Sequence, residues 1–229
     1  MSVPRLITNP QLRPQPTGSV LFLHGSGDTG NGIRLWIKEL LAKEWQFPHL
    51  RILFPTAPIL NYTPMGGVAS NVWFDRQSIS PSVPECLDSI NSSMDVLKKI
   101  VNQEVDLGIP LERIIIGGFS MGGAMAIHQT YRMFRDTAGC FAISSFLNDS
   151  SVVYESLKSN IEEHLPPLYM MHGDSDELVP MEWGTETLTC MQNFGIEGTM
   201  TVSNRVTHEL TKEQILNLTR WINMRIPCP

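Results

Sequence analysis

Residues Gly118–Gly122 form the pattern G-x-S-x-G, with Ser120 at its centre. A serine hydroxyl becomes a strong nucleophile only when a neighbouring base removes its proton, and many such serines occupy a sharp strand-to-helix turn called a nucleophile elbow. The pattern alone is a weak indication, because glycine and serine are common residues. A β-branched run at Ile114–Ile116 precedes it and a helical segment follows, which is the context that an elbow requires. We therefore predict that Ser120 is a nucleophile. A glycine-rich helix start with Ser120 as N-cap is less favoured, because an N-cap needs no glycine on both sides.

Enzymes built on such an elbow carry an acidic residue and then a histidine further along the chain. Asp174 and Asp176 both follow an apolar segment at 168–171, and either could be the acid. His208 is the only histidine after these carboxylates, so the chain order selects it as the base. Plainer roles in loops, in helices or at the surface suit the other histidines, which are His24, His49, His128, His164 and His172.

A second glycine-rich segment, Gly25–Gly30, matches the pattern G-x-G-x-x-G and follows an apolar run. A dinucleotide site of this type also needs an acidic residue at the end of the next strand. That predicted strand, 50–54, is followed by Pro55 and Thr56, so the acid is missing. The segment also lacks the Lys-Ser/Thr ending of a phosphate-binding loop. We therefore interpret it as a tight turn and expect no nucleotide cofactor.

Short apolar runs alternate with amphipathic segments along most of the chain, which predicts strands joined by helical crossovers. Strands are expected at 20–23, 50–54, 113–119, 138–144, 168–171 and 199–203. Helices are expected at 33–45, 84–107, 120–134, 152–163 and 182–194, and from 211 onward. Residues 55–71, which are rich in proline and glycine, are expected to form a loop. Together these predict a three-layer α/β/α sandwich with a mostly parallel central sheet in one domain at 19–229, preceded by a flexible N-terminal tail at 1–18.

Composition excludes several classes of protein. The 229 residues are 42% hydrophobic and only 17% charged, which rules out an intrinsically disordered chain. The net charge of −6, with no basic run, argues against nucleic-acid binding. No apolar run reaches the roughly 18 residues that a membrane span needs. The four cysteines lack metal-ligand spacing and the N-terminus lacks the pattern of a signal peptide, so we expect no metal site and a cytoplasmic location.

Five segments, in the same order, resemble the acyl-protein thioesterase/lysophospholipase family. They are His24–Gly30, Pro55–Pro58, Asn71–Asp75, Gly117–Gly123 and His172–Pro180. The resemblance covers nearly all of the chain after residue 18. The segment Tyr62–Met65, together with Ser26 and Met121, is most similar to the lysophospholipase-like protein 1 branch of that family.

This resemblance implies an α/β-hydrolase that cleaves acyl esters or thioesters through an acyl-enzyme, without metal or cofactor. It implies that Asp176 is the acid of the catalytic triad and that Asp174 braces the turn. The backbone N–H groups of Ser26 and Met121 are then the two donors of the oxyanion hole. The implied partner is an acylated protein or a small acyl ester, with palmitoyl-protein hydrolysis as the leading activity.

The sequence departs from acyl-protein thioesterases in ways that bear on the substrate. Met121 stands where glutamine usually follows the nucleophile, which keeps the backbone donor but changes the pocket wall. The loop at 56–71 also differs from theirs, and no N-terminal cysteine is available for lipidation of the enzyme itself. These last two differences count against a long palmitoyl chain. A short-chain carboxylesterase and a lysophospholipase remain alternative activities, and a non-catalytic binding module is a further alternative. We expect Met65 and Trp73 to contact the acyl group.

Overall fold

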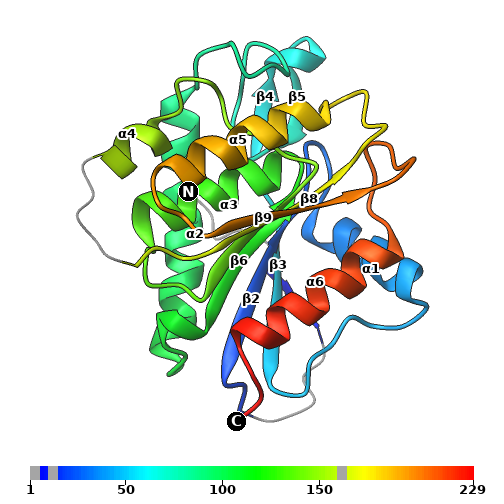
Figure 1. Ribbon diagram of the computed structural model, residues 1–229, viewed down its shortest axis with the longest axis vertical. Coiled ribbons are helices and arrows are strands. Elements are labelled where there is room, and N and C mark those ends of the chain that lie inside the picture. The colour runs from blue at the N-terminus through cyan, green and yellow to red at the C-terminus, as the bar shows by residue number, and fades with distance from the viewer. Residues whose placement is uncertain (1–5, 10–14, 159–163) are drawn as a thin grey trace.

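A seven-stranded sheet, with strand order β1-β3-β2-β6-β7-β8-β9, forms the centre of the computed structural model (Figure 1). The structure describes residues 6–9, 15–158 and 164–229. Neighbouring strands are parallel except β1 and β3, which are antiparallel. The strands are β1 (Leu6–Thr8), β2 (Gly18–Leu23), β3 (Leu50–Pro55), β6 (Ile114–Phe119), β7 (Gly139–Ile143), β8 (Leu168–Gly173) and β9 (Gly198–Ser203).

Helices cover both faces of this sheet (Figure 1). One face carries α2 (Leu87–Asp106), α3 (Met121–Met133), α4 (Val152–Lys158) and α5 (Met181–Asn193), and the other carries α1 (Gly30–Leu41) and α6 (Lys212–Arg225). The last helix begins with the capping box that its sequence predicts, formed by Thr211 and Gln214. Of the helix predicted at 152–163, the last five residues lie outside the described part of the chain.

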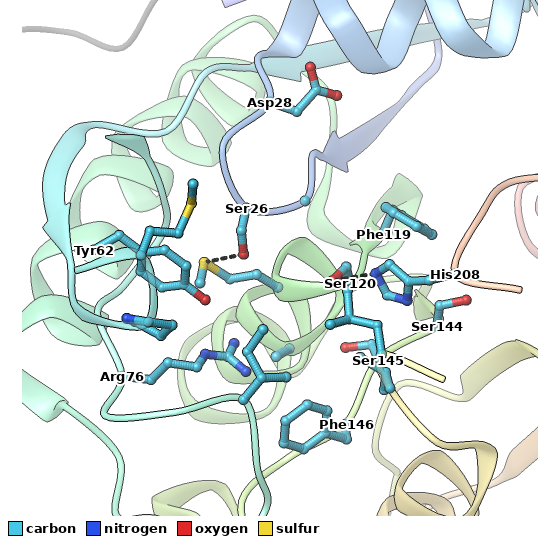
Figure 2. Close-up of a pocket in the computed structure, with 18 of the residues that line it drawn as sticks. Ser26, Asp28, Tyr62, Arg76, Phe119, Ser120, Ser144, Ser145, Phe146 and His208 are labelled. Carbon is cyan, nitrogen blue, oxygen red and sulfur yellow. Dashed lines mark hydrogen bonds between the residues drawn. The ribbon is translucent and has the colours of Figure 1, made fainter. Parts of the chain in front are cut away.

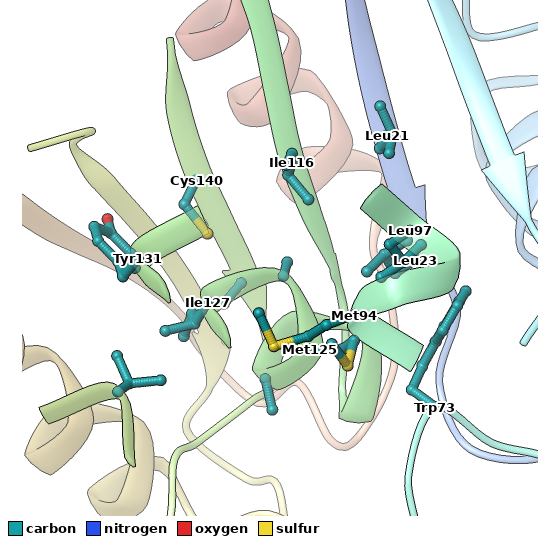
Figure 3. Packing of buried hydrophobic residues seen from close by; sticks show 14 of the residues in the cluster. Leu21, Leu23, Trp73, Met94, Leu97, Ile116, Met125, Ile127, Tyr131 and Cys140 are labelled. Atoms are coloured by element: carbon teal, nitrogen blue, oxygen red, sulfur yellow. The ribbon is translucent and has the colours of Figure 1, made fainter. Parts of the chain in front are cut away.

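The alternation of side chains along the buried strands divides the core into two clusters. Leu21 and Leu23 of β2 pack with α2 and α3, whereas Val20 and Phe22 of the same strand pack with α1 and α6. Figure 3 shows the first cluster, in which Leu97 of α2 and several side chains of α3 lie against the sheet. A sheet that is buried on both faces explains why its central strands are continuous apolar runs.

Residues 55–71, predicted as a loop, instead contain a small second sheet. Strand β4 (Ile59–Tyr62) pairs with β5 (Val68–Asn71) in an antiparallel hairpin. A short 3₁₀ helix at Thr63–Met65 makes the turn, and Gly66 and Gly67 complete it with φ values of 66° and 79°. The glycines provide positive φ at no steric cost, so the residues that suggested a loop are the ones that close the hairpin.

The N-terminal segment also differs from the flexible tail predicted at 1–18. Leu6–Thr8 form β1, which pairs with Leu53–Pro55 of β3. Leu6 packs against one core cluster and Ile7 against the other, and this contact fixes the strand. Residues 1–5 and 10–14 of the predicted tail lie outside the described part of the chain.

Candidate active site

Ser120 occupies the sharp turn between β6 and α3, with φ 54° and ψ −123°. Such a conformation is unfavourable for a residue with a side chain and persists only when its surroundings hold it. Its backbone N–H donates to Ile143 O at 2.8 Å, and this bond ties the turn to the end of β7. A Cβ atom on Gly122 would lie 2.3 Å from Leu23 O, so glycine is required for α3 to approach β2 this closely. The predicted elbow geometry is therefore present.

His208 lies next to Ser120 (Figure 2). It also contacts Asp176 and so connects the serine to that carboxylate. The distance from His208 Nε2 to Ser120 Oγ is 3.0 Å, and His208 Nδ1 donates to Asp176 Oδ2 at 2.8 Å. These residues follow β6, β8 and β9, whose carboxyl ends meet at one edge of the parallel sheet. The structure thus brings together the three side chains that were predicted to form a triad.

The structure separates the two candidate acids. The Asp176 side chain is fully buried, and its second oxygen, Oδ1, accepts the N–H groups of Leu178 and Val179 at 3.1 and 2.9 Å. Asp174 is exposed, and its Oδ1 accepts the N–H of Arg205 at 2.6 Å. Arg205 has a φ of 58°. Asp174 therefore supports the turn that precedes His208, whereas Asp176 contacts the histidine itself.

The two predicted oxyanion donors belong to neighbouring segments. Ser26 follows β2, and Met121 is the first residue of α3, where a backbone N–H has no partner within the helix. The hydroxyl of Ser26 donates to the sulfur of Met121 at 3.7 Å, which shows that the two segments are in contact. Gly27 donates its N–H to Asn71 O at 2.9 Å, so the end of the β4–β5 hairpin anchors the Ser26 loop. An oxygen anion above Ser120 could accept hydrogen bonds from both segments.

His24 and Trp73 support the Ser26 loop from behind. His24 Nδ1 donates to Gly25 O at 2.7 Å, and His24 Nε2 accepts the N–H of Ala57 at 2.9 Å. The indole N–H of Trp73 donates to His24 O at 2.8 Å. Trp73 was expected to contact the acyl group, but it is fully buried in the core and does not line the pocket. The prediction misplaced it because a large aromatic residue in a loop segment can face either the core or the substrate.

The protonation of His24 couples stability to pH. Burial lowers the pKa of His24 below its usual value of 6.5. Below pH 6.5 the unfolded chain therefore binds a proton that the folded chain does not, and the free energy of unfolding falls as the pH falls. The limit is about 1.4 kcal/mol per pH unit for one such histidine. In urea denaturation, we expect His24→Gln to cost more stability at pH 7.5 than at pH 5.5. An equal cost at both pH values would contradict a neutral His24.

A cavity of about 450 Å³ opens beside Ser120. Met65, which was expected to contact the substrate, lies in its wall, as do Tyr62, Arg76 and Phe146 (Figure 2). Sequence reasoning did not assign these last three to the pocket. Tyr62 was noted only as part of the segment Tyr62–Met65, and Arg76 and Phe146 belong to no motif. Within the described ranges, no group of three or more His, Cys, Asp or Glu residues is arranged to hold a metal ion.

No helix in the described part of the chain is both long and apolar enough to cross a membrane.

Comparisons with known proteins agree on one family. Residues 5–226 match the sequence profile described as phospholipase/carboxylesterase. The chain is 45% identical over 230 residues to mouse lysophospholipase-like protein 1, an alignment that covers 99% of this chain and 96% of that protein. It is 32% identical over 214 residues to acyl-protein thioesterase 1 homolog 1 of Dictyostelium discoideum, with 92% of each covered. The crystal structure of Zea mays acyl-protein thioesterase 2 superimposes with a TM-score of 0.83 at 19% identity, and covers 97% of this chain and 99% of that one.

Proposed function

The chain belongs to the phospholipase/carboxylesterase family, and on this basis we propose that it hydrolyses acyl esters or thioesters with Ser120 as nucleophile. The family membership confirms the predicted α/β-hydrolase fold and the resemblance to acyl-protein thioesterases. The observation that carries the assignment of residues is the continuous hydrogen-bonded chain from Ser120 through His208 to Asp176, with distances of 3.0 and 2.8 Å. A non-catalytic binding module has no need of these three side chains in hydrogen-bonded order, so this arrangement favours an enzyme.

In the proposed reaction, Ser120 Oγ attacks the carbonyl carbon of the substrate while His208 Nε2 takes its proton. Asp176 holds the imidazole with Nδ1 protonated and stabilises the imidazolium ion that forms. The backbone N–H groups of Ser26 and Met121 bind the oxyanion of the tetrahedral intermediate.

His208 then gives its proton to the leaving alcohol or thiol, and the acyl group stays on Ser120. A water molecule enters, loses a proton to His208 and attacks the acyl-enzyme. The collapse of the second tetrahedral intermediate breaks the bond to Ser120 Oγ, which recovers a proton from His208. The products are a carboxylic acid and an alcohol or thiol.

The pocket favours short acyl chains over long ones. Its volume of about 450 Å³ lies toward the small end of ligand sites, and a buried arginine, Arg76, forms part of the wall. A long alkyl chain packed against this cation would remove the remaining solvation of the guanidinium without pairing it. We therefore favour a short-chain esterase or thioesterase over a palmitoyl-protein hydrolase.

A series of p-nitrophenyl esters from acetyl to palmitoyl tests this proposal. We expect kcat/KM to be highest for short chains and to fall steadily as the chain lengthens. A maximum at palmitoyl would overturn the short-chain assignment. Labelling by an organophosphorus serine probe provides the control for the enzyme class, because a protein without an activated serine does not react with it.

We also propose that the enzyme works on acylated proteins or small esters in a reducing compartment such as the cytoplasm. The sulfur atoms of all four cysteines are free, and Cys86 and Cys228 are exposed. Exposed free thiols are typical of proteins that stay reduced. The net charge of −6 supports the expectation that nucleic acid is not a partner.

A further inference from the structure

Arg76 brings a positive charge into the candidate active-site pocket. It lies between β5 and α2, and its side chain points into the same cavity as Ser120 (Figure 2). Only 9% of its surface is exposed. Arginine stays protonated in proteins, so this residue is a nearly buried cation. Buried charges are normally paired, because burial removes the water that would otherwise solvate them.

Within the described ranges, no protein carboxylate forms an ion pair with the Arg76 guanidinium. Arg76 Nε has no hydrogen-bond partner, and no carboxylate lies within ion-pair distance of the guanidinium. Asp75 and Glu85 are close enough for their charges to stabilise the guanidinium, but both carboxylates contact other groups directly. Asp75 accepts the N–H and the hydroxyl of Thr63 at 2.8 and 2.6 Å. Glu85 accepts the N–H of Val152 at 3.0 Å, and its Oε1 lies 3.1 Å from His128 Nε2.

Two aromatic rings hold the guanidinium in place without using its N–H groups. The guanidinium carbon lies 4.8 Å from the centroid of the Phe74 ring and 5.5 Å from that of Phe146. Cation–π contacts of this kind stabilise the charge without providing an oxygen acceptor for the N–H groups. The rings therefore hold the guanidinium in the pocket wall while its Nε–H still lacks an acceptor.

Three further polar groups in the pocket wall lack partners in the described structure. These are the hydroxyl groups of Tyr62, Ser144 and Ser145. Buried polar atoms in native proteins are nearly always hydrogen-bonded, and a catalytic role or a bound ion is among the explanations for an exception. A cation and three hydroxyl groups around one cavity together suit an oxygen-rich anion.

The position of Arg76 relative to His208 indicates which part of a substrate would reach it. Figure 2 shows Arg76 and Tyr62 on one side of Ser120 and His208 on the other. The leaving group of an acyl-transfer reaction must lie beside His208, which gives it a proton. The acyl chain therefore extends toward Arg76 and Tyr62.

We propose that the preferred acyl chain ends in a carboxylate, which Arg76 binds with Tyr62 as a further donor. The substrates would be monoesters or monothioesters of short dicarboxylic acids. This inference rests on the proposed function and leaves its chemistry unchanged: Ser120 is acylated, water releases the acyl group, and the product is a dicarboxylic acid. The carboxylate supplies the direct ion pair that Arg76 does not make with any carboxylate in the described part of the protein.

Three thioesters test the proposal in the wild-type enzyme. The first is the adipoyl monothioester of N-acetylcysteamine, the second is the hexanoyl thioester of the same thiol, and the third is the hexanoyl thioester of 3-mercaptopropionate. The first and third both carry a carboxylate, but at opposite ends. We expect kcat/KM for the first to exceed both others by about ten-fold or more, which is typical for a hydrogen bond to a charged group. Equal values for the first and second would overturn the inference, and so would a preference for the third.

Variants assign the preference to the guanidinium. We expect Arg76→Met to bring the ratio between the first and second thioesters close to one, and Arg76→Lys to give an intermediate ratio because the charge remains but the planar fork is lost. Arg220, which is exposed, provides the matched control, and Arg220→Met should leave the ratio unchanged. A preference that persists in Arg76→Met would overturn the role of Arg76.

Protection of the wild-type enzyme from the organophosphorus probe gives a second measurement that needs no variant. Adipate should protect Ser120 from the organophosphorus probe at concentrations where 1,6-hexanediol does not, and equal protection would overturn the proposal. The probe also distinguishes failure of the anion site from failure of the proposed hydrolase activity. Labelling combined with equal turnover of the charged and neutral thioesters overturns the anion site alone, whereas absence of both labelling and turnover overturns the proposed function.

Discussion

Replacing Ser120 by alanine is expected to lower kcat for acyl esters by about a million-fold, which is the scale found when a triad serine is removed. The alanine side chain has no oxygen that can form the acyl-enzyme, and His208 then has no serine proton to take. The remaining turnover would come from the oxyanion donors and from substrate binding. Steady-state hydrolysis of a short p-nitrophenyl ester measures the loss.

The same variant should no longer react with an organophosphorus probe. Ser82→Ala is the matched control, because Ser82 is exposed and lies outside the pocket. It should be labelled at the wild-type rate. Labelling that persists in Ser120→Ala would place the nucleophile on another residue. Thermal unfolding of both variants should be cooperative, which excludes misfolding as the cause of the lost activity.

Replacing Asp176 by asparagine is expected to lower kcat by about ten-thousand-fold, as a change of this kind does in other triads. The reason lies in how the two carboxylate oxygens are used. Oδ1 accepts the N–H groups of Leu178 and Val179, and an asparagine would keep its oxygen there. Its NH₂ group would then face His208 Nδ1 and force that nitrogen to act as acceptor. The proton would move to Nε2, which could no longer take one from Ser120.

Asp174→Asn is the control for this prediction, since Asp174 belongs to the same segment and is exposed. Its Oδ1 accepts the N–H of Arg205, a bond that an asparagine oxygen can also accept. We expect kcat to change by less than about ten-fold, because the effect is limited to two exposed hydrogen bonds, from Arg205 N–H and from the Ser175 hydroxyl. The pair of variants is compared by kcat for one ester at fixed pH. The reverse order of effects would make Asp174 the acid.

The sequence alone selects the nucleophile and the base of the triad, but it does not select the acid. Ser120 stands out because its elbow needs small neighbours, and His208 because chain order leaves no other histidine. The choice between Asp174 and Asp176 depends on the turn that aims each carboxylate, and only the resemblance to a family separates them before the structure does. Asp174 and Asp176 are two residues apart on one loop, and this spacing does not indicate which carboxylate reaches the histidine.

The parts that sequence reasoning missed depend on long-range contacts. β1 forms because Leu6 and Ile7 pack against the apolar core beside β3, and no local sequence pattern predicts this contact. Arg76 is a similar case, since arginine is usually exposed and nothing in its neighbours predicts burial. Trp73 was assigned to the pocket by residue type, whereas its burial is decided by the bond to His24 and by the core around it.

The β4–β5 hairpin lies in a sheet of its own, and this separation has an evolutionary consequence. Among the described strands, no ladder joins the hairpin to the seven-stranded sheet, so we expect insertions and substitutions near its turn to leave the strand register of that sheet unchanged. Its far end is constrained differently, because Asn71 and Trp73 bond to the loop that carries Ser26. We expect descendants of this gene to diversify at Thr63–Gly67, where the range of acceptable acyl groups can change, and to accumulate few changes at Asn71–Trp73, where any change affects the rate for every substrate.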